Sequence, residues 1–494
     1  MIAEDFMRIS KRILCAVVCI AIACLFVPLV GCGFDSTVSK AAKKLNNYSI
    51  EASLDDESKT IVATEKFEAK FNEDRNELWF NLYGRAFREN AKILPYAETS
   101  KAKCFPLGEN FGSLEIESVK LNKQDAAFSY GGEDENVLIV ACNAKKGQKV
   151  VVEIAYKLYL CNCTHRLGYF ENNINLGNWY PVLCVYENGA YVADPYYSVG
   201  DPFYSDCANY CVQLSYPECY LIGCTGSEKT IIKSGTKTTK MEAKAVRDFA
   251  IVLGKNFATR STKFENTTIN YFGYEYDENL DASLETAKRA LKTFNELFGE
   301  YPYRTLTIAK TPFLFGGMEY PNLVWIADNI TDKIEITKVI AHEIAHQWWY
   351  GLVGNNEVSH SYIDESLAEY STVLFFNKND SYGYSGKQMV QDAATSYELY
   401  SEVIDSIKGT VNDTLNQPTT QFSTEYEYVY VVYVKGTLFL DALKDKVGEK
   451  AFVSTLKKYC KKFRFKIATR DDFLEMFSKT AGDDISDFFA EWKA

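Results

Sequence analysis

The sequence predicts an α+β protein with two folded parts: an N-terminal antiparallel β domain, and a mainly helical domain that contains a small sheet. Three observations predict this architecture. The chain has 494 residues, which is too many for one hydrophobic core. Short runs that alternate between apolar and polar residues dominate residues 48–257, and this pattern is typical of strands. In residues 258–494, longer segments carry apolar residues every three or four positions and predict helices.

The first 32 residues have the pattern of an export signal. Basic residues precede an apolar run from Ile13 to Val30, and Gly31 and Cys32 follow at once. The small residue before Cys32 resembles a bacterial lipobox, which would make Cys32 the lipid-modified first residue of a mature protein. The alternative is an uncleaved N-terminal helix, because an apolar run of this length just spans a bilayer. Both interpretations place the rest of the protein outside the cytoplasm, on the outer face of a bacterial cell membrane.

Composition narrows the function classes further. Residues 33–47 contain serine, lysine and alanine, and we expect a tether there. The net charge of −12 argues against nucleic-acid binding. Of the 14 cysteines, four lie in residues 1–32 and ten follow. We expect disulfides or buried free thiols among these ten, since the spacings from Cys207 to Cys224 do not match a paired C-x-x-C metal site.

The most informative segment is a helix expected from about Glu335 to Leu352. Its apolar periodicity places His342 and His346 four residues apart on one face of the helix. Two imidazoles one turn apart can hold one metal ion. Zinc suits such nitrogens, and a catalytic zinc usually has three protein ligands and one position for water. The carboxylate of Glu343 is the natural general base beside that water.

A second expected helix, from about Ser361 to Phe376, supplies a third ligand. Glu365 lies in its first turn, nineteen positions after His346. This spacing leaves room for a turn and an antiparallel return, so Glu365 is the best carboxylate ligand for the metal. The other two histidines, His165 and His360, lack ligand spacing, and we expect no direct metal role for either.

Three motifs in order resemble the gluzincin aminopeptidases of the aminopeptidase N type. The motifs are His342-Glu343-x-x-His346 with Glu365 after eighteen intervening residues, Gly316-Gly317-Met318-Glu319, and Tyr433-Val434-Lys435-Gly436. The resemblance implies a saddle-like β domain, a thermolysin-like catalytic domain over residues 258–494 and one zinc ion per chain. Larger members carry a further helical domain that closes over the cleft. The chain ends at Ala494 without one, so we expect a more open site that accepts longer peptides.

The segment before the zinc helix is expected to bind substrate. A helix from Leu280 to Phe298 and strands at 303–312 and 322–327 surround Gly316 and Gly317, so these glycines should lie on the edge of a small sheet. Missing side chains would let a peptide backbone approach there. The carboxylate of Glu319 could bind the free α-amino group of a peptide, which would fix the scissile bond one residue from the terminus.

Tyr433 is the second expected catalytic residue. Tyrosines crowd this stretch, and only the Lys435-Gly436 context distinguishes Tyr433; its neighbour Tyr428 is a weaker candidate. The resemblance implies that the Tyr433 hydroxyl donates to the oxyanion of the reaction. Four further helices are expected after this segment, at Leu438–Val447, Ala451–Phe463, Arg470–Thr480 and Asp484–Trp492.

These residues together predict a membrane-tethered extracytoplasmic zinc aminopeptidase that acts on peptides with a free N-terminus. One alternative is a zinc endopeptidase or another hydrolase on the same site, since the resembled family includes an epoxide hydrolase. The other is a catalytically inactive surface lipoprotein that only binds. The presence of both Glu343 and Tyr433 argues against the inactive protein, because a binding protein needs neither.

Overall fold

The computed structural model describes residues 36–494, so the expected signal segment and Cys32 lie outside the described residues. The described part begins with helix α2 (Ser36–Ala42), in which Val38 is buried, and strand β1 (Asn46–Asp55) follows. The stretch expected to be a tether therefore contains a short helix and the start of the first strand. Between residues 36 and 494, every helix is too short or too polar to cross a membrane.

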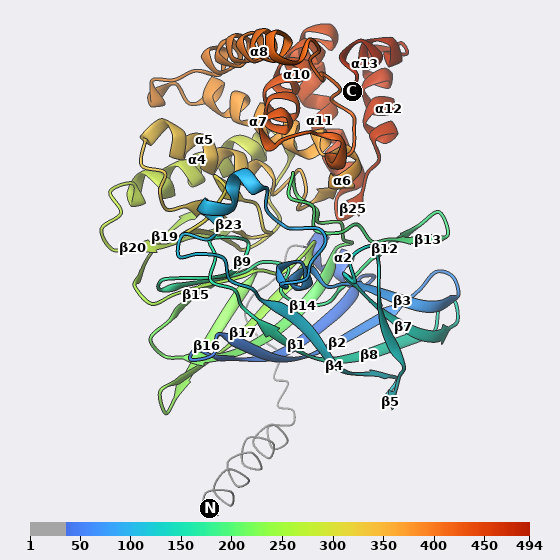
Figure 1. Ribbon diagram of the computed structural model, residues 1–494. Coiled ribbons are helices and arrows are strands. Elements are labelled where there is room, and N and C mark those ends of the chain that lie inside the picture. Colours follow the sequence, from blue (N-terminus) through green and yellow to red (C-terminus); the bar gives the residue numbers. More distant parts are fainter. Residues whose placement is uncertain (1–35) are drawn as a thin grey trace, which may run out of the picture. The chain divides into compact units, whose positions relative to one another are not determined.

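An eight-stranded sheet forms the main layer of the N-terminal domain (Figure 1). Buried and exposed side chains alternate along its long strands β2 and β8, as expected for a sheet that covers a core with one face. All neighbouring strands are antiparallel except β1 and β14, which are parallel. The order is β16 (Ser227–Lys233), β17 (Thr236–Val246), β14 (Ala208–Pro217), β1, β2 (Thr60–Lys70), β8 (Lys149–Tyr159), β4 (Ser113–Leu121) and β5 (Gln124–Asp125).

Two four-stranded antiparallel sheets and a hairpin complete this domain. The first sheet contacts the second domain, because the Asn175 side chain donates to the Pro312 carbonyl at 3.1 Å and accepts from the Thr311 hydroxyl at 2.8 Å. The strands are β15 (Leu221–Cys224), β18 (Ile251–Gly254), β10 (Asn173–Leu176) and β9 (Leu167–Phe170); β11 (Val182–Leu183), β3 (Arg75–Asn81), β7 (Val137–Ala144) and β6 (Phe128–Gly131); and β12 (Val185–Glu187) with β13 (Ala190–Val192).

The second domain is built on a five-stranded sheet with parallel strands in the middle and antiparallel pairs at both edges. Its order is β19 (Phe257–Phe264), β20 (Thr267–Tyr274), β21 (Thr305–Thr311), β23 (Leu323–Ala327) and β22 (Gly317–Met318). Strand β22 is the edge strand, which confirms the expected position of Gly317. Helices α4 (Leu280–Phe298) and α5 (Lys333–Ala345) pack on this sheet (Figure 1). The bounds of α4 are those expected from its apolar periodicity.

Helices make up the rest of the second domain. The four helices expected after Lys435 are all present. They are α10 (Gly436–Val447), α11 (Glu449–Phe463), α12 (Arg470–Ala481) and α13 (Ser486–Trp492), and before them come α6 (Glu357–His360), α7 (Tyr362–Lys378), α8 (Gly386–Lys408), α9 (Glu425–Tyr428) and the π-helix η5 (Val429–Lys435). Two short strands, β24 (Val353–Gly354) and β25 (Lys466–Ile467), pair in parallel and join the segment after α5 to the C-terminal helices.

Arg247, at the end of the β domain, holds the two domains together. Its fully buried guanidinium donates to the backbone carbonyls of Tyr350, Ser205 and Lys466 at 2.6, 2.6 and 2.9 Å. These three carbonyls belong to the turn after α5, the β domain and β25. A Cβ atom on Gly354 would lie 2.2 Å from the guanidinium carbon, so only glycine leaves room for this arginine.

Candidate active site and metal centre

Helix α5 carries the expected zinc-binding histidines at its C-terminal end. Asp332 caps its N-terminus by accepting from two backbone N–H groups at 2.9 Å, as an N-cap aspartate should. The helix ends at Ala345, seven residues before the expected Leu352. The chain then turns tightly, with Tyr350 at φ 102° and the Gly351 N–H donating to the His346 carbonyl at 2.9 Å. His346 is therefore the last residue held by the helix.

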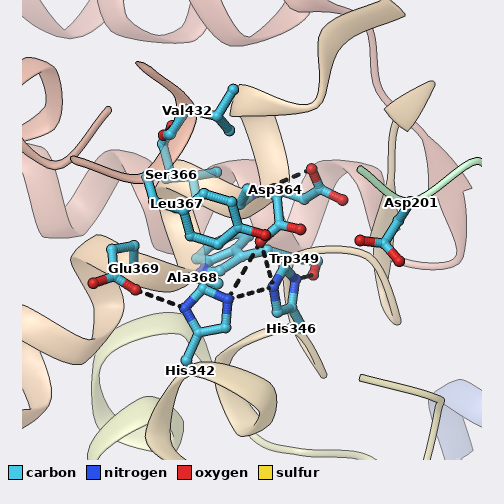
Figure 2. A network of polar contacts seen from close by, with 12 residues as sticks. Asp201, His342, His346, Trp349, Asp364, Ser366, Leu367, Ala368, Glu369 and Val432 are labelled. Atoms are coloured by element: carbon cyan, nitrogen blue, oxygen red, sulfur yellow. Dashed lines mark hydrogen bonds and ion pairs between the residues drawn. The ribbon is translucent and has the colours of Figure 1, made fainter. Parts of the chain in front are cut away.

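His342, His346 and Glu365 converge on one point, and Figure 2 shows the two imidazole rings side by side. The two Nε2 atoms lie 3.1 Å apart, and each lies 3.3 Å from Glu365 Oε2. Tetrahedral zinc with ligands at about 2.1 Å places neighbouring donors about 3.4 Å apart, so this triangle is close to the size that a zinc ion needs. Burial opposes ionisation of Glu365, but hydrogen bonds from both histidines outweigh it and keep the pKa of this carboxyl well below its usual range. Within residues 36–494 no other set of three such ligands converges in this way.

The remaining ring nitrogens of the two histidines are also held. His342 Nδ1 lies 2.9 Å from Glu369 Oε2, and His346 Nδ1 lies 2.9 Å from the Trp349 carbonyl (Figure 2). Both acceptors require a proton on Nδ1, which leaves Nε2 of each ring free for a metal. The sequence analysis missed Glu369. Its spacing of four residues from Glu365 on α7 was the available signal, because it places both carboxylates on one helix face.

Replacing Glu369 by alanine should weaken zinc binding by about tenfold to a hundredfold, because the acceptor that orients the His342 ring is lost. The measurement is the zinc dissociation constant in competition with a chromophoric chelator. Glu335→Ala is the matched control, since Glu335 is another carboxylate that lines the cleft. An unchanged dissociation constant in Glu369→Ala would show that the Trp349 and Glu365 contacts suffice to fix the site.

Glu343 is buried next to the metal ligands, and its Oε2 has no partner within residues 36–494. Burial, opposed by the His342 charge, raises the pKa of Glu343 to about 8. A carboxyl with a pKa near neutrality is suited to accept and return a proton. A Cβ atom on Gly317 would lie 2.3 Å from Glu343 Oε1. Glycine at this edge-strand position is therefore needed to leave room for the Glu343 carboxylate. It would also let a substrate backbone approach.

Glu319 is 4% exposed, and its Oε1 has no partner among the described residues. Its backbone carbonyl accepts from the Gln347 side chain at 3.1 Å, which ties the Glu319 segment to the end of α5. Burial, with the nearby Asp201 adding to it, raises the pKa of Glu319 to about 8. The side chain is therefore buried beside the metal ligands, and one of its oxygens is available to a ligand.

The β domain contributes a buried ion pair to this site, between Arg166 and Asp201. Arg166 Nε also donates to the Met318 sulfur at 3.0 Å, so the pair supports the backbone that presents Glu319. Burial, partly offset by Arg166, raises the pKa of Asp201 to about 7. No substrate-binding residue of the β domain was predicted. The two residues are 35 positions apart and carry no spacing signal that could have linked them.

Tyr433 lies on the π-helix η5, a rare conformation that is frequent at functional sites. Its ring stacks on that of His342, with 5.7 Å between ring centroids and an interplanar angle of 19°. Burial and the negative charge of Glu365 raise the pKa of Tyr433 well above its usual value. The hydroxyl therefore keeps its proton and can donate a hydrogen bond beside the metal site.

The lysine and glycine that follow Tyr433 have structural roles. Lys435 is buried, and its Nζ donates to the Trp492 carbonyl at 3.1 Å and to the Asp413 carbonyl, so it anchors the C-terminal helices. A Cβ atom on Gly436 would lie 2.1 Å from the Ser366 hydroxyl. The glycine thus lets α10 approach α7, which carries Glu365.

The site opens into a cleft of about 590 Å³ that both domains line. Residues from the β domain include Ser100, whose hydroxyl donates to Glu425 Oε2 at 2.5 Å and so joins the two sides of the cleft. The predicted residues brought together here are Gly316, Gly317, Glu319, His342, Glu343, His346, Glu365 and Tyr433, and Tyr428 also lines the cleft.

The other histidines and the cysteines stay outside the metal site. His165 Nε2 contacts the Pro95 carbonyl at 3.0 Å, and His360 Nδ1 contacts Asn416 Oδ1 at 2.7 Å. The ten cysteines in the described part of the chain are free thiols. Seven of them are buried, as in the second of the two alternatives left open, whereas Cys142 and Cys211 are half-buried and Cys219 is exposed. Cys161 and Cys163 have their sulfurs 3.0 Å apart.

A comparison with known protein families finds a match for most of the second domain. A family profile described as "Peptidase family M1 domain" matches residues 282–492. These residues form a peptidase family M1 domain. The match confirms the resemblance to the aminopeptidase N-like family on which the site residues were predicted.

Curated relatives of this M1 domain are aminopeptidases. It is similar to aminopeptidase N of Lactobacillus delbrueckii subsp. lactis, with 28% identity over 235 residues (44% of this chain, 27% of the relative). It is also similar to human aminopeptidase B, with 30% identity over 200 residues (38% and 29%), and to bovine endoplasmic reticulum aminopeptidase 2, with 26% identity over 221 residues (42% and 22%). The chain thus spans less than a third of the length of these relatives.

A solved structure extends the similarity to the β domain. The crystal structure of an M1 zinc metallopeptidase from Deinococcus radiodurans superposes with a TM-score of 0.65 and covers 91% of this chain and 93% of its own. Its sequence identity is 15%. The two-domain arrangement of a β domain followed by the M1 domain is therefore a known fold.

Proposed function

We propose that the protein is an extracytoplasmic, membrane-tethered zinc aminopeptidase that removes N-terminal residues from peptides. The observation that carries this proposal is Glu319, a buried carboxylate in the same cleft as the zinc ligands, with one oxygen that has no partner in the described part of the chain. An endopeptidase has no need for an unpaired buried carboxylate at this position. An α-ammonium group would pair with it and favour its charged form.

The residues divide the hydrolysis between them. His342, His346 and Glu365 would hold the zinc ion, which when bound lowers the pKa of a water and polarises the scissile carbonyl. Glu343 takes a proton from the attacking water and passes it to the leaving amine. The Tyr433 hydroxyl donates to the oxygen that becomes negative in the transition state.

Substrate alignment follows from the edge strand β22. One side of β22 pairs with β23, and the other side has no strand neighbour in the described sheet. An extended peptide can add to such an edge through main-chain hydrogen bonds. Gly316 and Gly317 leave this edge without side chains, and Glu319 then fixes the amino terminus so that the first peptide bond faces Glu343.

We infer the location from the sequence context of Cys32, where an apolar segment ends at a small residue and a cysteine. A lipid on Cys32 would tether the protein to the outer face of the membrane. Mass spectrometry of the membrane-extracted protein should find a diacylated N-terminal Cys32, whereas an intact N-terminus before Cys32 would support the uncleaved helix.

The function is tested with one short peptide in free and N-acetylated forms, using protein that lacks residues 1–32 and is supplied with zinc. We expect cleavage of the free form alone, one residue at a time, because the acetylated amide has no charge for Glu319 to bind. Glu319→Ala should lose this preference, and Glu335→Ala should keep it. Equal or better cleavage of the acetylated peptide would make the protein an endopeptidase, and cleavage of neither would favour the inactive binding protein.

A further inference from the structure

Helix α8 presents an apolar stripe to solvent. Of its 23 residues only Gly386 and Met389 are buried. Leu399, Val403 and Ile407 are 57, 54 and 72% exposed. Intervals of four residues place these three side chains along one side of the helix. An exposed row of large aliphatic side chains on a helix is unusual for a surface that contacts only water.

The first half of α8 is linked to the cleft through Tyr384. Asp392 lies seven residues before Leu399, on the same side of α8, and accepts from the Tyr384 hydroxyl at 2.6 Å. Lys338 Nζ lies 4.6 Å from the centre of the Tyr384 ring, and Lys338 lines the cleft. Burial and the hydrogen bond to Asp392 raise the pKa of Tyr384. The negative charge of Glu369, which lines the cleft, adds to this effect.

The second side of the cleft also reaches α8. The Tyr400 ring of α8 stacks on Tyr430 of η5, with 4.3 Å between ring centroids. Val429, the residue before Tyr430, lines the cleft and is 44% exposed. Helix α8 is thus connected to both sides of the cleft, to Lys338 through Tyr384 and to Val429 through Tyr430.

We propose that this stripe of α8 binds the part of a peptide substrate that follows the scissile bond. The inference rests on the aminopeptidase function proposed above. Glu319 follows Met318, which Arg166 contacts, whereas Glu369 and Lys338 line the cleft next to His342 and Tyr384. In this proposal the peptide therefore runs from Glu319 past Glu369 and Lys338 toward α8. An extended chain covers about 3.3 Å per residue, and α8 is about 34 Å long. A chain along the whole of α8 would use roughly ten residues in addition to those in the cleft, so the preferred substrates are peptides longer than this with apolar side chains in their second half.

A second copy of the chain is a poorer occupant than a peptide. A stable dimer interface needs about 800 Å² from each partner, and one row of three side chains on a single helix offers far less. The sides of α8 that face away from the stripe carry charged residues, at Glu398, Glu402 and Asp405. A narrow apolar row beside a cleft instead matches the width of one extended peptide.

The test compares a dipeptide with a peptide of about twelve residues that has the same first two residues and leucines in its second half. The variant is Leu399→Glu with Val403→Glu. The matched control is Ile231→Glu with Ile232→Glu, which changes two equally exposed residues (64 and 59%) on the edge strand β16. We expect the ratio of kcat/KM for the long peptide to that for the dipeptide to fall about tenfold in the α8 variant, through KM, and to stay unchanged in the control.

The possible failures are distinguishable. If the wild-type protein with zinc does not cleave the dipeptide, the proposed function itself is wrong. If it does, and the α8 variant keeps the wild-type ratio, the role of α8 is wrong and the aminopeptidase function stands. A wild-type dimer that dissociates in the α8 variant, measured by sedimentation, would also overturn the peptide role and assign the stripe to a second copy.

Discussion

Glu343→Gln is expected to lower kcat for peptide hydrolysis about a thousandfold while the protein keeps its zinc. The amide cannot accept the proton of the attacking water, and general-base catalysis of this kind contributes about 10²- to 10⁴-fold. Glutamine has nearly the shape of glutamate, so the close contact with Gly317 should persist. The measurements are kcat for a free peptide and the zinc content of the purified variant.

Glu335→Gln is the control for this substitution, since it makes the same chemical change on the same helix. It should keep wild-type activity. Hydrolysis by Glu343→Gln at a rate comparable to wild type would remove Glu343 as the base. Loss of zinc from Glu343→Gln would show instead that the substitution disturbs the ligands.

Tyr433→Phe is expected to lower kcat about a hundredfold, or by about 3 kcal/mol of barrier, the usual cost of losing one donor to a developing oxyanion. Phenylalanine retains the ring that stacks on His342, so zinc binding and the π-helix should survive. Because the lost hydrogen bond forms in the transition state, KM should change little.

Tyr430→Phe is the matched control for this hydroxyl. Tyr430 lies on the same π-helix, but it stacks on Tyr400 of α8 and not on a metal ligand. It should leave kcat for a dipeptide within about twofold of wild type, since surface changes seldom cost more. Equal losses in both variants would mean that η5 is disturbed as a whole and that the Tyr433 hydroxyl has no special role.

The two zinc-binding histidines could be predicted because they depend on local geometry. Four-residue spacing fixes His342 and His346 on one helix face whatever the rest of the fold does. The end of α5 could not be predicted in the same way. Trp348, Trp349 and Leu352 continue the apolar pattern of a helix, yet they are buried in a turn. Burial alone produces that pattern, so it does not distinguish a helix end from a buried turn.

Contacts between distant segments could not be predicted from the sequence. Ser100 meets Glu425, and Arg166 meets Met318, only because the β domain folds against the M1 domain. Asp201 meets Arg166 through the folding of the β domain itself. Nothing in the tyrosine-rich stretch before Lys435 signals a π-helix, since its hydrogen bonds differ from those of an α-helix by one residue. Helix α8 was also not predicted. Only two of its residues are buried, so its apolar residues do not repeat in the way that a helix packed on a core requires.

The position of Arg247 means that the M1 domain is not a detachable module. Three backbone carbonyls, two of them in the M1 domain, share one guanidinium that the β domain supplies. A fragment restricted to residues 258–494 would lose the guanidinium donor to the Tyr350 carbonyl, at the turn after the zinc helix, and to the Lys466 carbonyl of β25, at a cost of about 1.5–3 kcal/mol for each hydrogen bond to a charged group. Shuffling this catalytic unit onto another protein would therefore require carrying the β domain with it.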